Sequence, residues 1–257
     1  MILVLGGTKD GRDLATLLAE KGYQVMVSVF SDYGRDLLQL HKDLIHTGPL
    51  DTDGFASFIQ TNAIHLIVDA SHPYAINVSE NAMKACHIVN IPYIRYERPA
   101  ATLPAYDGLH VVHDYAQAAQ LAATLGKVIF LTTGSRHLHF FKTPASLQEH
   151  RVIARVLPEP SVLAECLQLG FKPQDIVAIQ GPFSHNLNVS LFQEYKTEVI
   201  VTKNSGKIGG SDTKITAAIA LNLPLVMIDR PIIQYSKVVY DIADVINFIR
   251  EVPKCNI

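Results

Sequence analysis

Cysteine is scarce in this chain and shows no pattern. The 257 residues include three cysteines, Cys86, Cys166 and Cys255, which lie far apart and form no Cys-x-x-Cys pair. A disulfide framework or a structural zinc site needs several cysteines at short, regular spacing. Both are therefore excluded, and we expect reduced thiols in a cytoplasmic protein.

Charge of either sign is also scarce. Only 18% of the residues are charged, the formal net charge is −2, and 48% of the residues are hydrophobic. A nucleic-acid-binding protein usually carries a clear basic excess, and a disordered chain is poorer in apolar residues. The composition predicts a folded protein with a substantial core and no nucleic-acid partner. Eleven histidines add hydrogen-bonding groups whose positive charge depends on pH.

Long hydrophobic runs are missing. The longest apolar stretch, 215–228, is interrupted by Asn222 and Pro224 and is too short to span a bilayer. The apolar residues at the N-terminus are followed at once by glycines, which leaves no room for the apolar region of a signal peptide. We therefore expect a soluble, cytoplasmic protein that does not bind membranes.

What the chain does have is a regular alternation of short apolar runs and helical patterns. The expected strands are 2–5, 24–30, 44–47, 66–69, 93–96, 128–132, 152–157, 176–180, 199–202 and 225–229. The expected helices are 10–21, 34–40, 51–61, 74–89, 115–125, 161–169, 186–195, 213–221 and 243–250. Nearly continuous apolar strands separated by single helices are typical of parallel sheets covered on both faces.

The segment 98–104 contains two prolines and no periodicity, so it is the expected linker. We therefore predict an α/β fold with two doubly wound, Rossmann-like lobes, residues 1–98 and 105–257, and a cleft between them. Ligands of such sheets bind at the carboxyl ends of the strands.

A glycine-rich turn follows the first expected strand. Gly6, Gly7 and Gly11 form a G-G-x-x-x-G pattern that opens a helix, with Thr8 between them. Glycines allow the backbone to approach a diphosphate, and the N–H groups at the helix start point toward it. The alternative is an ordinary strand-to-helix turn capped by Thr8 or Asp10. The pattern alone favours nucleotide binding only slightly.

Polar loops follow several other expected strands, whereas three common catalytic motifs are absent. The loops are 69–74, with His72 and a possible cap at Ser71, then 132–137, 181–185, and 201–207 continuing into 209–214. His137 and His139 have no third metal ligand at suitable spacing, so surface histidines are favoured. Lys207 is followed by Ile208, which excludes a Walker A loop; no tyrosine precedes a lysine by four places, and no G-x-S-x-G occurs.

Taken in order, these loops resemble the precorrin-6A reductase family over essentially the whole chain. The matching pieces are Gly6-Gly7-Thr8 with Gly11-Arg12, Asp69-Ala-Ser-His-Pro-Tyr-Ala75, Thr133-Gly134, Gly181-Pro-Phe183, Thr202-Lys-Asn-Ser-Gly206, Lys214 and Asp229-Arg-Pro231. Asp10-Gly11 stands where the family has Glu followed by Ala or Gly, which keeps a carboxylate. The resemblance implies NADPH-dependent reduction of one ring double bond of a corrin precursor on the route to cobalamin. It does not separate the metal-free substrate from the cobalt complex, and the protein itself needs no metal.

The resemblance also implies roles for individual residues. The residues assigned to NADPH are Gly6, Gly7, Thr8, Gly11, Arg12, Ser31, Arg35 and Ser71. Ser31 and Arg35 are the candidates for the ribose 2′-phosphate, although Asp32 beside them is of the kind that favours NADH. His72 is the candidate proton donor or orienting group, with the substrate or a water molecule as alternatives.

A flat polycarboxylate macrocycle calls for scattered cations on a broad surface. The residues assigned to this substrate are Tyr74, Arg98, Arg136, Lys203, Ser205, Gly206, Lys207, Lys214 and Arg230, with His72 and His137 in support. The alternatives are another NAD(P)-dependent reductase or epimerase acting on an anionic substrate, and a sensor that binds a dinucleotide without turnover.

Overall fold

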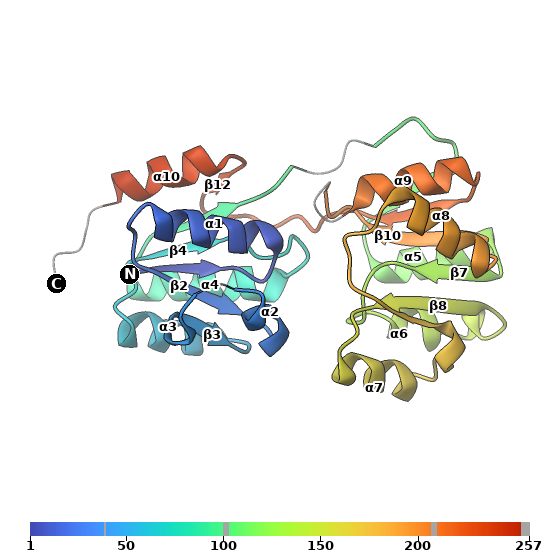
Figure 1. Cartoon of the computed structure of the whole chain (residues 1–257), viewed down its shortest axis with the longest axis horizontal. Coiled ribbons are helices and arrows are strands. Elements are labelled where there is room, and N and C mark those ends of the chain that lie inside the picture. Colours follow the sequence, from blue (N-terminus) through green and yellow to red (C-terminus); the bar gives the residue numbers. More distant parts are fainter. Residues whose placement is uncertain (39, 100–102, 207–209, 253–257) are drawn as a thin grey trace. The chain divides into compact units, whose positions relative to one another are not determined.

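The computed structural model describes residues 1–38, 40–99, 103–206 and 210–252, which form two compact units. The first unit combines Met1–Pro99 with Pro231–Ile257, and the second is Ala100–Arg230. Figure 1 shows the elements of each unit. Lys207, Cys255 and part of the expected linker lie outside the described residues.

The first unit is a six-stranded, all-parallel sheet in the order β12-β5-β4-β1-β2-β3. Its elements are β1 (Ile2–Leu5), α1 (Lys9–Glu20), β2 (Val25–Val29), α2 (Asp32–Asp36), β3 (Ile45–Thr47), α3 (Thr52–Thr61), β4 (Leu66–Asp69), α4 (Ile76–Val89), β5 (Tyr93–Tyr96), β12 (Val238–Val239) and α10 (Ile242–Glu251). This is the doubly wound order, in which the direction of winding reverses between β1 and β4.

Both faces of the first sheet are covered, because successive side chains of a strand point to opposite faces. Ile2 and Val4 of β1 pack with α1 and α10, whereas Leu3 and Leu5 pack with α3 and α4. Figure 1 shows α1 and α10 together on one side of this sheet. The near-continuous apolar strands of the sequence are thus explained by burial on two sides.

The second unit repeats this arrangement with the strand order β6-β11-β10-β7-β8-β9, again all parallel. Its elements are β6 (Leu109–Val112), α5 (Tyr115–Leu125), β7 (Val128–Leu131), α6 (His139–Lys142), β8 (Arg151–Val156), α7 (Pro160–Gln168), β9 (Ile176–Ala178), α8 (His185–Glu194), β10 (Val199–Lys203), α9 (Ser211–Ala220) and β11 (Leu225–Ile228). The winding reverses between β7 and β10. Helices α8 and α9 cover one face through Phe192, Ile215 and Ala218.

The α/β class and the parallel sheets are confirmed, but the structure corrects the expected second domain, 105–257. Residues from Pro231 onward return to the first unit. β12 pairs with β5, and Val245 and Ile249 of α10 are buried in the core around β1 and β4. The amphipathic C-terminal helix needs an apolar face to cover, and that face belongs to the first sheet.

Two edge strands, β6 and β12, were not expected from the sequence. His110 interrupts the apolar run of β6, and β12 is only two residues long, so neither gives the continuous apolar pattern of a buried central strand. None of the helices in the described part of the chain combines the length and apolar character that a membrane crossing requires.

Candidate functional site

The glycine-rich turn lies at the carboxyl end of β1, where the first sheet reverses its winding. Thr8 caps α1: its hydroxyl accepts a hydrogen bond from the Gly11 N–H (3.1 Å) and donates one to the Ala70 carbonyl (3.1 Å). A Cβ on Gly11 would lie 2.7 Å from the Gly6 Cα, and a Cβ on Gly6 would lie 2.9 Å from Val27 Cγ1. Gly6 and Gly11 are therefore needed for packing.

Gly7 differs from these two glycines. A Cβ at Gly7 would meet nothing within 4 Å, and the residue is exposed. Its backbone is also outside the left-handed region. Nothing in the folded chain thus requires glycine at position 7, and the open space above the turn is where a ligand would approach the N-terminus of α1.

A buried ion pair supports the same turn. Arg98, just after β5, contacts Asp10 in the first turn of α1 at 2.6 Å, and both side chains are 8% exposed. The carboxylate at the helix start is thus neutralised by the chain itself, which lowers its repulsion of an anionic ligand. Arg98 was assigned to the substrate; the structure places it beside the turn assigned to the cofactor.

At the carboxyl end of β2, Ser31 caps the short helix α2, accepting from the Gly34 N–H. Arg35 forms ion pairs with Asp32 (2.6 Å) and Asp36 (3.2 Å). Its charge is therefore already balanced on the surface of α2. Asp32, the residue that disfavours a phosphate, is one of the two partners.

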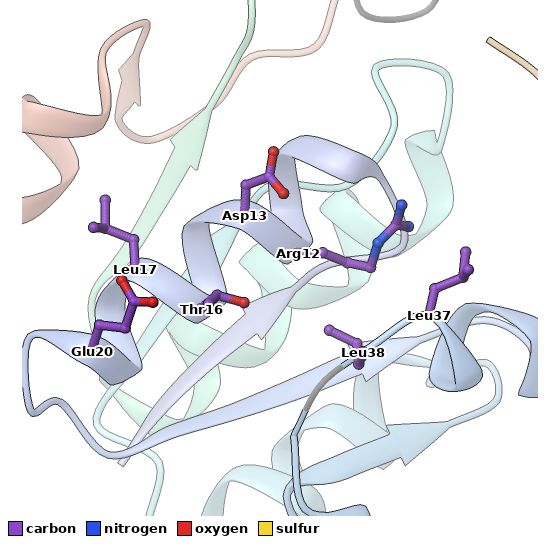
Figure 2. A pocket seen from close by; sticks show the side chains of 7 residues that line it. All are labelled: Arg12, Asp13, Thr16, Leu17, Glu20, Leu37 and Leu38. Atoms are coloured by element: carbon purple, nitrogen blue, oxygen red, sulfur yellow. The ribbon is translucent and has the colours of Figure 1, made fainter.

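Arg12 lies nearby without an ion pair among the described residues. It lines a groove of about 500 Å³ between α1 and the end of α2. The groove is lined by Arg12, Asp13, Thr16, Leu17, Glu20, Leu37 and Leu38. Figure 2 shows the Arg12 side chain extending from α1 toward Leu37.

The loop after β4 is held by a buried polar network. Asp69 is fully buried and accepts hydrogen bonds from Ser79 (2.6 Å), Tyr93 (2.6 Å), Arg95 (2.8 Å) and the Ser71 N–H (2.9 Å). Burial alone would raise the pKa of Asp69, but Arg95 and these donors hold it below its ordinary value. The carboxylate is therefore charged and fully satisfied.

Arg95 connects this network to the C-terminal segment. It is 1% exposed, forms a second ion pair with Glu97 (2.7 Å), donates to Ser71 Oγ (3.0 Å), and lies over the ring of Tyr235. Ser71 is thus fixed at both its N–H and its hydroxyl. The position of the following residue, His72, is set by this network.

His72 is partly exposed, and its Nδ1 accepts a hydrogen bond from the Tyr74 N–H (3.3 Å). An acceptor Nδ1 places the proton of the neutral ring on Nε2. The ring centroids of His72 and Tyr74 lie 5.6 Å apart. The contact with the Tyr74 N–H holds the His72 ring at the start of the segment that leads into α4.

The second unit carries polar groups at the equivalent point, between β7 and β10. Gly134, after β7, has φ +79°, a conformation that favours glycine. The Thr133 and Thr202 hydroxyls are buried and have no hydrogen-bond partner among the residues that the structure describes. Buried hydroxyls without partners at the switch point of a sheet mark a candidate binding site.

The loop after β10 folds back on itself. Ser211 Oγ accepts from the Ser205 N–H (3.0 Å) and donates to the Lys203 carbonyl (3.0 Å). Gly206 has φ +77°, and Gly210, which precedes α9, has φ +68°. Ser205 and Gly206 therefore shape the loop.

Positive groups gather around this loop. Burial and the neighbouring charge of Arg136 lower the pKa of Lys203 to about 8. Burial, Lys203, His139 and Arg136 lower the pKa of His137, whose ring lies 4.0 Å from that of Tyr115. Burial is the main cause of both shifts, and a cluster of groups with shifted pKa values is a candidate functional site.

The two remaining candidates of the second unit lie at the same edge. Lys214, 7% exposed, is in the first turn of α9. Arg230 Nε donates to the Asn204 carbonyl at 2.9 Å. Each unit therefore gathers its own expected residues at its switch point. In the described part of the chain, no three His, Cys, Asp or Glu side chains come together as a metal site would require.

Sequence reasoning missed the residues that support the site. Tyr93, Arg95 and Glu97 were not singled out, and Asp10 was named only as a possible helix cap and as a departure from the family pattern, because nothing in a single sequence shows which charges converge. Asp69 stood inside the matched loop, and its position at the end of an apolar strand was the available signal.

Comparison with known proteins gives a consistent result. The family model described as "Precorrin-6x reductase CbiJ/CobK" matches residues 1–250. The chain is 40% identical to cobalt-precorrin-6A reductase of Priestia megaterium over 248 residues, 96% of this chain and 97% of that one. It is 35% identical to precorrin-6A reductase of Rhodococcus erythropolis, with 90% and 89% covered. A solved structure, "CobK precorrin-6A reductase", superposes with a TM-score of 0.80 at 26% identity, covering 97% and 96%.

Proposed function

The chain belongs to the precorrin-6x reductase CbiJ/CobK family, and on this premise we propose that it reduces a ring double bond of precorrin-6A or cobalt-precorrin-6A in cobalamin biosynthesis with a hydride from NADPH. The observation that carries the cofactor assignment is the Gly7 turn. It is open to solvent, lies at the switch point of a doubly wound sheet, and is followed by the Thr8-capped N-terminus of α1.

In this proposal, the first unit binds the cofactor. Gly6, Gly7, Thr8 and Gly11 bring the backbone close to the diphosphate. Ser31, Arg35 and Arg12 surround the end of β2, where the ribose 2′-phosphate lies in such folds. Arg12 is the strongest of these candidates, because Arg35 is already paired with two carboxylates.

The second unit supplies positive charge for the carboxylates of the macrocycle. Arg136 and Lys203 are the cations of this cluster, and the Arg136 charge contributes to the lowered pKa of Lys203. His137 lies beside them and adds a hydrogen-bonding group. Lys214 and Arg230 lie at the same edge. A local positive field of this kind is compatible with a net charge of −2.

Bound NADPH supplies the hydride, and the chain supplies orientation and electrostatics. The Asp69–Arg95 network fixes Ser71, and through it His72, beside the glycine turn. His72 then either donates the proton that completes the reduction or orients the reacting group, and the substrate or a water molecule is the alternative source of that proton.

The test is NADPH oxidation by purified protein, followed by absorbance, with precorrin-6A and its cobalt complex compared side by side. Relatives of both names match the chain, so the preferred substrate names the branch of the pathway. If the protein binds NADPH tightly but oxidises it with neither substrate, the reductase proposal is refuted and a dinucleotide sensor is favoured.

A further inference from the structure

Arg155 is a buried arginine that has no acidic partner in the described part of the chain. It is the penultimate residue of β8 and is 5% exposed. Its Nη1 donates to Asn188 Oδ1 at 2.8 Å, and it forms no ion pair with any of the described residues. Burial lowers its pKa to about 10. The chain therefore buries a positive charge that it does not neutralise.

The other buried arginines show that this is unusual for the molecule. Arg95 contacts the carboxylates of Asp69 and Glu97, and Arg98 contacts that of Asp10. A buried charge left without its counter-charge is strongly destabilising. An amide oxygen satisfies one N–H of Arg155 but leaves the charge in place.

The surroundings of the Arg155 guanidinium resemble those of an arginine that binds an anion. The ring of Phe183 lies 4.2 Å from it and covers one face. The ring of Phe130 lies 5.9 Å from the guanidinium. Among the described residues, only Nη1 of the guanidinium has a hydrogen bond. An arginine stacked on an aromatic ring keeps its edge free to bind a carboxylate through two N–H groups.

Arg155 is also linked to the loop that carries the candidate substrate residues. Asn188 Nδ2 donates to Thr213 Oγ1 (3.3 Å), which lies within hydrogen-bond distance of the Phe183 carbonyl (3.0 Å) and the Gly210 carbonyl (3.1 Å). The loop 181–183, which matched the family without a role, thus holds the aromatic cover of Arg155. The loop after β10 ends at the same small network.

We propose that Arg155 is an anion-binding residue whose guanidinium pairs with a carboxylate of the tetrapyrrole macrocycle. The inference rests on the proposed function for the identity of this ligand. The burial of the guanidinium, the missing counter-charge among the described residues and the N–H groups without a hydrogen bond there support it independently of the hydride chemistry.

The experiment compares Arg155→Met with the unchanged chain and with Arg151→Met. Arg151 stands on the same strand and lies near an aromatic ring, but it is paired with Asp175, so it is a matched control. The probe is uroporphyrin III, a stable octacarboxylate tetrapyrrole, titrated against each protein by fluorescence, with NADPH titrated separately. Melting temperature is recorded for each variant.

We expect uroporphyrin III to bind Arg155→Met about 30-fold more weakly, the usual effect of removing one partner of a buried charge pair. Arg151→Met should bind it unchanged, and NADPH affinity should be the same in all three proteins. The melting temperature of Arg155→Met should hold or rise, since an unpaired charge is replaced by an apolar chain of similar length. Arg155→Lys keeps the positive charge but cannot bind a carboxylate through two parallel N–H groups, so it should give an intermediate affinity.

Unchanged uroporphyrin III binding in Arg155→Met or, if that variant does not fold, in Arg155→Lys would overturn the proposal. So would a loss of NADPH affinity in its place, which would identify the anion as a cofactor phosphate. A lowered melting temperature without any loss of binding would show that Arg155 is structural. Failure of the unchanged chain to oxidise NADPH would count against the reductase function alone, because the uroporphyrin III titration measures binding and does not require turnover.

Discussion

The glycine turn gives the sharpest prediction, because two of its glycines serve different purposes. In Gly7→Val the new Cβ meets no atom within 4 Å in the folded chain, and residue 7 is exposed. The free energy of unfolding should therefore change by less than about 0.5 kcal/mol. The same side chain stands where the diphosphate would approach the N-terminus of α1. A hydrogen bond to a charged group contributes about 1.5–3 kcal/mol, so NADPH should bind roughly 10-fold to 150-fold more weakly.

Gly11→Ala is the matched comparison. The new Cβ would lie 2.7 Å from the Gly6 Cα and 3.1 Å from the Ala70 carbonyl oxygen. Overpacking of this kind costs about 1–3 kcal/mol, which outweighs the gain of about 1 kcal/mol when alanine replaces glycine inside a helix. We therefore expect a lower melting temperature for Gly11→Ala.

Both variants are assayed by equilibrium NADPH titration and by thermal unfolding. The reasoning requires a binding defect with an unchanged melting temperature for Gly7→Val. Normal NADPH affinity in Gly7→Val would refute the assignment of the open turn to the cofactor. A melting temperature as low as that of Gly11→Ala would show that Gly7 is a packing residue after all.

Three further predictions concern charged residues. Asp69→Asn should lower the free energy of unfolding by about 3 kcal/mol, because it leaves Arg95 with one carboxylate instead of two. The measurement is urea denaturation, and a change below about 1 kcal/mol would show that the Asp69–Arg95 pair contributes little to stability. Arg12→Gln should raise the NADPH dissociation constant but not that for NADH, whereas Arg35→Gln should change neither appreciably; equal effects of the two variants would argue against Arg12. Because the pKa of Lys203 is lowered to about 8, it is charged below that pH and neutral above it. kcat/KM for the macrocycle should therefore fall above pH 8, and Lys203→Arg should remove this decline.

Much of the fold could be predicted from local patterns. The central strands were recognised because they are apolar on both faces, as Leu3 and Val4 illustrate on β1. Of the four edge strands, β3 and β9 were expected, whereas β6 and β12 were missed because His110 interrupts the apolar run of β6 and β12 is only two residues long. The return of α10 to the first sheet was missed because an amphipathic pattern shows that a helix must pack, but not against which sheet.

The candidate site, too, was predicted in part from the sequence and in part only from the structure. The polar loops after β1, β4, β7 and β10 were predicted to carry the function, and the structure places them at the two switch points. That Gly6 and Gly11 are packing residues while Gly7 faces open space was not visible in the pattern they share. The roles of these residues in binding NADPH and the macrocycle stay predictions.

By itself, the sequence determined the alternation of strands and helices, the glycine turn and the family, because each is carried by residues close together in the chain. Only the tertiary structure decided which charges are neutralised. Asp10 meets Arg98 across 88 positions, Asp69 meets Arg95 across 26, and Arg155 meets no acid in the described part of the chain. Charge pairing depends on distances in space, and those are set only when the strands take their order in the sheet.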